Sequence, residues 1–490
     1  MEYSVQIMPH NQILRVSEGS NLLSVLREAG YVLDAACGGH GTCGKCRVIV
    51  NGQEQLACQT MVNADMTVSL RETAAVSIMS DSSVQNVPGA SDNGYFLAFD
   101  IGTTTVVCYL LSDRKELACA SMLNPQVVYG ADVISRIQAG INGKAEHMWQ
   151  LLQDGMEQLI QEVCAKAKIE AKQIGRIAVV GNPAMQQLFM GIDLKNLVTM
   201  PFTPAITAAQ SVPGKDYLPS CENAELLVVP DISCYVGADT VACVIATKLY
   251  EATKTTLLVD IGTNGEMVLG NAQRMIACST AAGPAFEGAK IKFGMRGAPG
   301  AIDHVWLADG EIKCHVIGDV SATGICGSGL IDAVAVALDA GLINPRGRIQ
   351  TSQEIDGQRF IPLCDGIYLT QEDIREVQLA KSAIASGVEL MAAQLELGVS
   401  QIEEVILAGA FGSFMDPRSA CRIGLLPAVL EDRITAVGNA AGAGAKELAC
   451  HGDILAHTQH LAEQIEFIEL ADLSAFPRTF ARNISFTQPH

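Results

Sequence analysis

Four cysteines near the start of the chain constrain its fold more than any other feature. They follow the spacing C-x5-C-x2-C-x11-C, and the first three lie in a glycine-rich run. The positions are Cys37, Cys43, Cys46 and Cys58. Four thiolates can hold a [2Fe–2S] cluster, and the plant-type framework C-x4-C-x2-C is one residue shorter in the first gap. Glycines let such a loop bend tightly, with backbone N–H groups pointing at the sulfurs.

Two other interpretations of these cysteines are open. Structural zinc sites usually consist of two separated ligand pairs, whereas three of these cysteines are crowded together and the fourth is distant. Disulfide frameworks belong to secreted proteins, and no signal-peptide pattern follows Met1. The spacing therefore favours an iron–sulfur cluster in a reducing compartment, with zinc as the alternative.

The residues around the cysteines predict a small mixed domain. Alternating apolar residues over 4–8 and 12–16 predict a hairpin, and residues 21–29 have helical spacing. Residues 46–50 predict a strand that enters the Asn51-Gly52 turn. This order, with the cysteine loop after the helix, resembles the plant-type ferredoxin domain over residues 1–75. The resemblance implies an α+β ferredoxin-like (β-grasp) fold that carries one electron.

Length and charge exclude several classes of function. At 490 residues the chain should form two to four domains. Its net charge of −20 argues against nucleic acid and against anionic membranes as partners. The longest apolar run, residues 226–245, is interrupted by Asp231 and Asp239, so no segment is expected to span a membrane. We expect a cytoplasmic location.

A short motif occurs twice in the rest of the chain. Residues 95–99 and 106–111 read as strands around Asp-Ile-Gly-Thr-Thr-Thr, residues 100–105. Residues 256–259 and 267–269 flank Asp-Ile-Gly-Thr-Asn-Gly-Glu, residues 260–266. One such hairpin is a weak signal, but two copies indicate an internal duplication, with two similar halves facing each other across a cleft.

The residue types in these turns suit a polyphosphate. Backbone N–H groups and hydroxyls in a glycine- and threonine-rich turn accept phosphate oxygens. An aspartate at a strand end can hold Mg²⁺, usually through water. A third stretch follows a strand expected at 401–407 and runs Ala-Gly-Ala-Phe-Gly-Ser-Phe, residues 408–414. Small residues at 437–445 open a helix, where a flat base and ribose could lie against the backbone.

Together these motifs resemble the acetate and sugar kinase, Hsp70 and actin superfamily over residues 95–450. Residues 100–105 look like its first phosphate loop, 260–266 like its second and 407–414 like its adenosine loop. The resemblance implies an α/β two-lobed, actin-like ATPase domain made of two ribonuclease-H-like lobes, with ATP and Mg²⁺ between them. The candidate ATP contacts are Gly102, Thr103, Thr104, Thr105, Gly262, Thr263, Asn264, Gly265, Gly409, Ala410, Gly412 and Ser413.

The candidate catalytic residues of this domain are three carboxylates. Asp100 and Asp260 are expected to hold Mg²⁺. Glu266 is either the residue that orients the attacking water or a strand-end carboxylate without a catalytic role.

A ferredoxin domain fused to such an ATPase resembles the ATP-dependent reductive activators of corrinoid proteins. Residues 124–137 and 282–288 look like that family too. The expected domains are 1–75 (ferredoxin), 76–94 (linker), 95–255 (lobe I) and 256–490 (lobe II with a C-terminal extension). The resemblance implies transfer of one electron from the cluster to Co(II) of a corrinoid protein in a methyltransferase system. It also implies an upstream ferredoxin or flavodoxin-like donor, and it leaves a homodimer open.

Two rival functions use the same motifs. An ATP-driven electron donor to a dehydratase-type enzyme shares the ATPase but binds a [4Fe–4S] cluster across a dimer. A small-molecule kinase with a redox-sensing ferredoxin domain would need a carboxylate base placed against a substrate hydroxyl. Iron content and substrate-dependent ADP formation separate these rivals from the activator.

Overall fold

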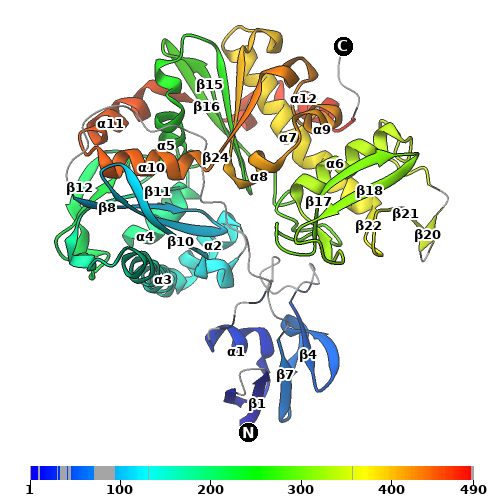
Figure 1. The fold of residues 1–490 in the computed structure, drawn as a ribbon, viewed down its shortest axis with the longest axis horizontal. Coiled ribbons are helices and arrows are strands. Elements are labelled where there is room, and N and C mark those ends of the chain that lie inside the picture. The colour runs from blue at the N-terminus through cyan, green and yellow to red at the C-terminus, as the bar shows by residue number, and fades with distance from the viewer. Residues whose placement is uncertain are drawn as a thin grey trace.

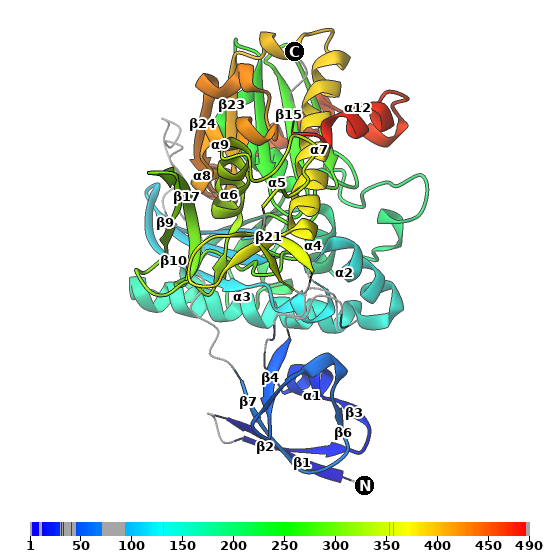
Figure 2. The ribbon, with the colours of Figure 1, turned by 90° about the vertical axis from the view of Figure 1, so that its right-hand side faces the viewer.

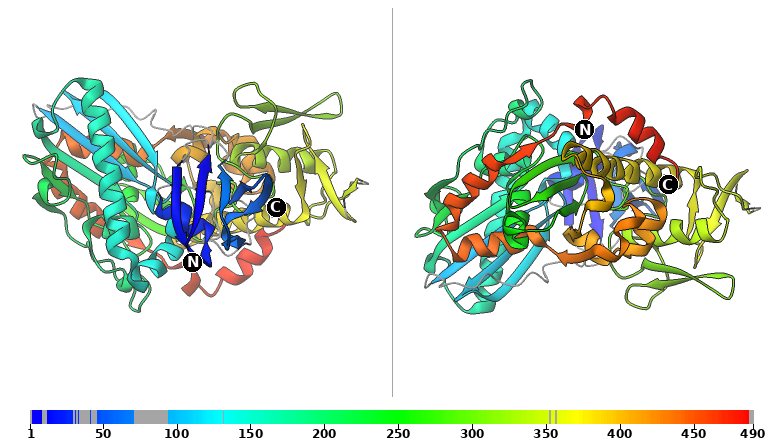
Figure 3. Two further views of the ribbon diagram at one scale, coloured as in Figure 1. Left: turned by 90° about the horizontal axis from the view of Figure 1, so that it is seen from below. Right: turned by 90° about the horizontal axis from the view of Figure 1, so that it is seen from above.

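The structure is a computed structural model that describes residues 2–8, 12–29, 31, 33, 41, 46–70, 94–130, 132–351, 353–355 and 357–486. The expected linker therefore lies almost wholly outside the described residues. Figure 1 and Figure 2 show a small N-terminal domain that stands apart from two larger lobes. Seen from below in Figure 3, this domain lies across the middle of the molecule, with lobe I on one side and part of lobe II on the other.

The N-terminal domain is a five-stranded sheet covered by one helix. The strand order is β2-β1-β7-β4-β5, with β1 and β7 parallel. Helix α1 buries Leu22 and Leu26 against Val5 and Ile7 of β1, so the hairpin and helix predicted from the sequence are confirmed. The elements are β1 (Glu2–Met8), β2 (Gln12–Ser17), β3 (Ser20–Asn21), α1 (Leu22–Glu28), β4 (Arg47–Val50), β5 (Gln53–Leu56), β6 (Met61–Val62) and β7 (Met66–Ser69).

Lobe I is built on a six-stranded sheet with the order β10-β9-β8-β11-β13-β12. Long helix α3 packs on it because Met148, Leu152, Met156 and Leu159 recur on one face. The strands are β8 (Tyr95–Ile101), β9 (Thr105–Ser112), β10 (Lys115–Leu123), β11 (Ile174–Gly181), β12 (Gln210–Pro213) and β13 (Glu225–Val228). The helices are α2 (Val133–Ala139), α3 (Ala145–Ala167), α4 (Pro183–Met190) and α5 (Ala238–Thr247).

Lobe II repeats the same topology. Its sheet has the order β24-β23-β14-β15-β16-β25. In both lobes a three-stranded antiparallel meander is followed by two parallel strands on the other side of its first strand. The strands are β14 (Thr256–Ile261), β15 (Gly265–Asn271), β16 (Arg274–Thr280), β23 (Glu404–Ala408), β24 (Ile434–Gly438) and β25 (Ile465–Phe467). The expected duplication of a ribonuclease-H-like unit is confirmed.

An insertion between β16 and β23 enlarges lobe II. It comprises β17 (Ala301–Ala308), β18 (Glu311–Val316), β19 (Gly324–Ile325), α6 (Gly327–Asp339), β20 (Glu354–Ile355), β21 (Gln358–Pro362) and β22 (Tyr368–Thr370). Helix α7 (Gln371–Gln394) follows it and packs on β15 and β16, as α3 packs on β9 and β10. The remaining helices are α8 (Gly409–Phe414), α9 (Pro417–Ile423), α10 (Ala440–Cys450), α11 (Ile454–Gln464) and α12 (Phe476–Asn483).

Helices α10 and α11 return from lobe II to lobe I, and the chain then rejoins lobe II at β25, which pairs with β16. Helix α10 lies against α5 and β8 (Figure 1). A Cβ added to Gly444 would come within 2.1 Å of the Ala242 carbonyl oxygen, so only glycine allows this close packing. The small residues of 437–445, expected to face a base and ribose, thus include one whose role is helix packing.

Two predicted boundaries differ from the structure. Asp100 and Asp260 were expected in turns, but each is the second-last residue of a strand, β8 or β14. Their side chains are therefore fixed by sheet pairing, in register with Val107 and Glu266 on the neighbouring strands. The strand expected at 401–407 begins only at Glu404, because residues 399–401 form a 3-10 turn.

Candidate functional site

Two of the four cluster cysteines lie among the described residues, and they are neighbours. Cys46 precedes β4 and Cys58 lies in the turn after β5, with 1% and 7% of their surfaces exposed. The backbone N–H of Cys58 points at the Cys46 Sγ, 3.5 Å away. Asn21 fixes the same turn by donating to the Cys58 carbonyl at 2.8 Å. Cys37 and Cys43 lie outside the described residues.

This arrangement fits an iron–sulfur cluster. Thiolate ligands are stabilised by backbone N–H donors and by burial in an apolar shell. Both cysteines are buried, and the Cys46 sulfur accepts from a backbone N–H. Within the described part of the chain, no three His, Cys, Asp or Glu side chains converge as metal ligands. A complete ligand set at this position therefore needs Cys37 and Cys43 as well.

The hairpin tip between β8 and β9 is held firmly from below. Its own turn closes when the Gly102 N–H donates to the Thr105 carbonyl at 2.9 Å. The buried side chain of Asn124 donates to the Gly102 carbonyl at 2.8 Å. Buried Arg136 of α2 donates to the Thr103 carbonyl, and to the Gly130 carbonyl at 3.0 Å. These contacts fix the carbonyls of the tip from the lobe I side, and the Thr103 hydroxyl accepts from the Asn182 side chain at 3.1 Å.

The hairpin tip between β14 and β15 is the lobe II counterpart. Its turn closes when the Gly262 N–H donates to the Asn264 carbonyl at 2.9 Å. Gly265 is buried, and a Cβ there would lie 2.8 Å from the Thr280 Oγ1. Gly265 therefore serves packing within lobe II, while Gly262, Thr263 and Asn264 remain partly exposed.

One carboxylate joins the two hairpins. Glu287 accepts from the Thr104 hydroxyl at 2.9 Å and from the Thr263 hydroxyl at 2.5 Å. Thr104 belongs to lobe I and Thr263 to lobe II, so the two repeated motifs face each other as the duplication predicted. Glu287 lies in the 282–288 stretch that carried part of the family likeness.

Four carboxylates in or beside the hairpin strands lie close enough to act on one another. Desolvation raises the pKa of Asp100 to about 6, and Asp260 adds repulsion. Desolvation likewise raises the pKa of Asp260 to about 6. The pKa of Asp239, at the start of α5, rises to about 7 through desolvation and the charges of Asp260 and Asp100. Burial, together with Asp239 and Asp260, raises the pKa of Glu266 well above its usual value.

This donor set fits a hydrated divalent cation. The raised pKa values mean that the carboxylates lack a compensating positive charge, which Mg²⁺ supplies. The carboxylates do not converge as direct ligands among the described residues, and Mg²⁺ characteristically keeps several waters and binds through few carboxylates plus phosphate oxygens. The site therefore fits a magnesium–nucleotide complex better than a bare ion.

The predicted adenosine loop begins beside this site. Gly409 has φ +82°, and a Cβ there would lie 2.5 Å from the Asp260 Oδ1. Both facts require glycine at this position. Gly412 is buried against Leu407. The side chains of Ala410 and Ser413 are outside what the structure describes, so their contact with a nucleotide stays a prediction.

Sequence reasoning missed four residues of the site: Arg136, Asp239, Glu287 and Asn439. Asn439 donates to the Asp100 Oδ2 at 2.8 Å and caps α10 by accepting from the Gly442 N–H at 2.7 Å. Arg136 and Glu287 lay in stretches valued only for family likeness, and Asp239 served only as an interruption of an apolar run. Asp239 could have been recognised from its position, because burying a charged residue within an apolar run costs free energy unless the charge is paired or functional.

Comparisons with known proteins agree along the whole chain. Residues 254–490 match the family described as "C-terminal domain of RACo the ASKHA domain". Residues 95–252 match "RACo middle region", and residues 5–63 match "2Fe-2S iron-sulfur cluster binding domain".

Two curated relatives and one solved structure are similar over most of their length. "Corrinoid activation enzyme RamQ" of Eubacterium limosum is 32% identical, over 96% of this chain and 97% of the relative. The "[Co(II) methylated amine-specific corrinoid protein] reductase" of Methanosarcina barkeri is 26% identical, over 80% and 77%. The structure titled "Reductive activator for corrinoid,iron-sulfur protein" has 28% identity and a TM-score of 0.73, over 99% and 98%.

Proposed function

This chain belongs to the RACo family of reductive activators of corrinoid proteins, and from that premise we propose that it returns Co(II) of a corrinoid protein to Co(I) at the expense of ATP. One electron leaves the reduced cluster, and the cobalt substrate gains it. The observation that carries the proposal is the meeting of both phosphate hairpins at Glu287. It occurs in a chain that also carries the cluster cysteines.

The N-terminal domain supplies the electron. A plant-type [2Fe–2S] cluster, once bound, is a one-electron carrier with a potential of about −400 mV. Cys37, Cys43, Cys46 and Cys58 are its proposed ligands. The buried turn at Cys58 and the N–H directed at the Cys46 sulfur would stabilise the thiolates.

ATP is needed because the electron goes uphill. For one electron, each ~59 mV is a tenfold penalty, so a gap of ~100 mV costs about 2.3 kcal/mol. Binding of ATP between the lobes can offset this gap if it favours a different arrangement of the complex with the corrinoid protein. In the cleft, Asp100 and Asp260 would hold hydrated Mg²⁺. Thr103, Thr104, Thr263 and Asn264 would contact phosphates, and Glu266 or Asp239 would orient water.

The partners of this protein and its location in the cell are part of the same proposal. A methyltransferase corrinoid protein is the electron acceptor, and a ferredoxin or flavodoxin-like protein is the upstream donor. The described cysteines are free thiols, most of them buried, which suits a reducing cytoplasm. No helix in the described part of the chain has both the length and the apolar character needed to cross a bilayer. A homodimer remains one option for the assembly.

An anaerobic reduction assay tests the proposal. The full-length protein is reduced with an artificial donor, mixed with a Co(II) corrinoid protein from a methyltransferase system, and followed by Co(I) absorption with and without Mg-ATP. We expect Co(I) only when ATP is present, and none from a Cys43→Ser variant. Cys119→Ser is the matched control, because Cys119 lies in lobe I. Co(I) formation at the normal rate by Cys43→Ser would refute the electron path.

A further inference from the structure

Glu287 occupies the position that phosphate oxygens are expected to take. Both of its carboxylate oxygens accept hydrogen bonds from hydroxyls, one from Thr104 at 2.9 Å and one from Thr263 at 2.5 Å. These are the hydroxyls assigned above to the phosphates of ATP. A hydroxyl has one hydrogen to donate, so it cannot serve a carboxylate and a phosphate fully at the same time.

We propose that Glu287 is a nucleotide-displaced latch: it holds the two hairpins together in the nucleotide-free protein, and the phosphates of ATP replace it. Carboxylate and phosphate are both anionic acceptors, so they repel each other and compete for the same donors. The inference rests on the proposed function only in taking ATP as the ligand.

The cations near Glu287 fit this exchange. The charge of Glu287 acts on the guanidinium of Arg136, and Arg296 opposes it from the following segment. Arg136 is fully buried beneath the lobe I hairpin. When ATP displaces Glu287, the negatively charged phosphates replace its carboxylate near these guanidinium groups. The positive charges therefore keep a negative partner.

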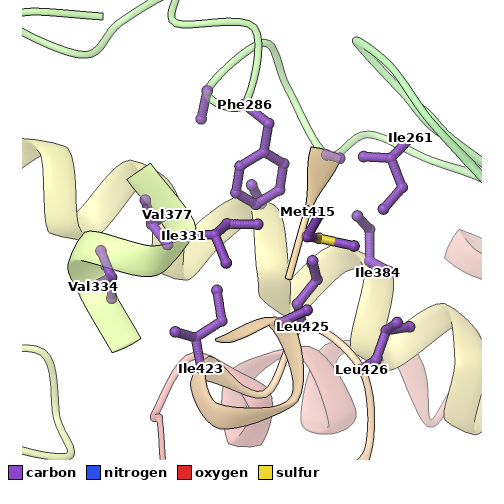
Figure 4. Packing of buried hydrophobic residues seen from close by; sticks show 14 of the residues in the cluster. Ile261, Phe286, Ile331, Val334, Val377, Ile384, Met415, Ile423, Leu425 and Leu426 are labelled. Carbon is purple, nitrogen blue, oxygen red and sulfur yellow. The ribbon is translucent and has the colours of Figure 1, made fainter. Parts of the chain in front are cut away.

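Displacement of Glu287 has a mechanical consequence because its neighbour is anchored. Phe286 is only 3% exposed and belongs to the core of lobe II. Figure 4 shows its ring pointing into a cluster with Ile331 of α6 and Met415. A shift of the Glu287 backbone therefore strains or repacks this cluster, since close-packed cores respond to small displacements.

The segment after Glu287 continues the connection into the insertion. Ile325 of β19 pairs with it on both sides, since the Met295 N–H donates to the Ile325 carbonyl at 2.9 Å and the Ile325 N–H donates to the Phe293 carbonyl at 2.8 Å. The Lys292 N–H donates to the Asp373 carboxylate in the first turn of α7 at 2.8 Å. Displacement of Glu287 would therefore be transmitted to β19 and α7. Both elements are distant from Glu287 in sequence, but hydrogen bonds connect them directly to the segment that follows it.

The test measures nucleotide binding in the full-length protein without a corrinoid partner. We compare Glu287→Gln with wild type by calorimetric titration of the Mg-bound, non-hydrolysable ATP analogue AMPPNP. Removing the charge should tighten binding by about tenfold, because the repelling anion is gone. Glu311→Gln, on the exposed strand β18, is the matched control and should bind as wild type does.

Hydrogen exchange of the backbone amides in residues 284–296 provides a second readout. We expect AMPPNP to speed exchange there in wild type, and Glu287→Gln to exchange fast already without nucleotide. If Glu287→Gln does not fold, Glu287→Asp shortens the side chain so that it cannot reach both hydroxyls, and the same two results are expected.

Two outcomes would overturn the latch. Weaker AMPPNP binding by the variant would mean that Glu287 helps to hold the nucleotide, and unchanged affinity with unchanged exchange would mean that the bridge is inert. Failure of cobalt reduction would not affect either measurement.

Discussion

The two phosphate hairpins share a topology but are supported in different ways. The lobe I tip is held through its carbonyls by the buried side chains of Asn124 and Arg136. The lobe II tip is braced from its own sheet, where the Thr280 hydroxyl donates to the Gly265 carbonyl at 3.2 Å, and by the close approach of Gly409 to Asp260. Duplication preserved the strands and the Asp-Ile-Gly-Thr motif, while the supporting residues diverged.

This difference suggests a division of labour. A tip bonded through its carbonyls by a buried guanidinium and a buried amide should keep its shape more firmly than a tip bonded by the Thr280 hydroxyl and by the contact of Asn264 with Glu266. Lobe II also carries Glu287 and the insertion, which are the parts proposed to respond to ATP. We therefore expect lobe I to position the nucleotide and lobe II to respond to its binding.

The largest effect is expected on ATP hydrolysis, when the aspartates of the two hairpins are substituted one at a time. Asp100→Asn and Asp260→Asn should each lower kcat for ATP hydrolysis by about 1,000-fold, roughly 4 kcal/mol, because each removes a carboxylate proposed to hold hydrated Mg²⁺. Steady-state release of phosphate measures this. Asp309→Asn, in an exposed turn of the insertion, is the control. A loss confined to one aspartate would show that the duplicated motifs no longer share the metal.

A smaller effect compares the supports of the two tips. Arg136→Met should lower the free energy of unfolding by about 3 kcal/mol, since it leaves the Thr103 and Gly130 carbonyls buried without donors. Thr280→Val should cost only about 1 kcal/mol, because it removes one neutral hydrogen bond. Urea unfolding monitored by circular dichroism measures both, with exposed Arg359→Met as the control. Equal losses would contradict the proposed difference in rigidity.

The smallest expected effect is the pH dependence of the shared carboxylates. The folded pKa values of Asp100 and Asp260 are about 6, above the ordinary 3.8. Their contribution to stability is therefore fully present below pH ~4 and is lost as pH rises through ~6. Protonation also competes with Mg²⁺, so Mg-ATP should bind about tenfold more weakly at pH 5.5 than at pH 7.5. Titrations at both pH values check this, and affinity that rises at pH 5.5 would refute it.

The fold could be predicted from the sequence because its signals were local and repeated. Two hydrophobic hairpins with the same tip predicted two lobes, and alternation with helical spacing predicted the N-terminal hairpin and α1. The composition of the tips predicted that their threonines contact phosphate, and this stays a prediction. Asp239 and Asn439 could not be predicted in the same way, because their contacts with the carboxylate site depend on how α5 and α10 pack. The periodicity of apolar residues along the sequence does not indicate how these two helices pack.

The return of α10 to lobe I restricts how the two lobes can move. The chain passes between them three times, from α5 to β14, from β24 to α10 and from α11 to β25, which pairs with β16 of lobe II. Two bodies joined at three attachments shift least where the attachments lie, so opening and closing displace most the parts of the cleft that are far from them. Asn439, which bonds to Asp100, lies at the second attachment. Asp100 is therefore close to one attachment, where opening and closing displace atoms least, and this proposed magnesium-holding side chain can stay in place while the rest of the cleft moves.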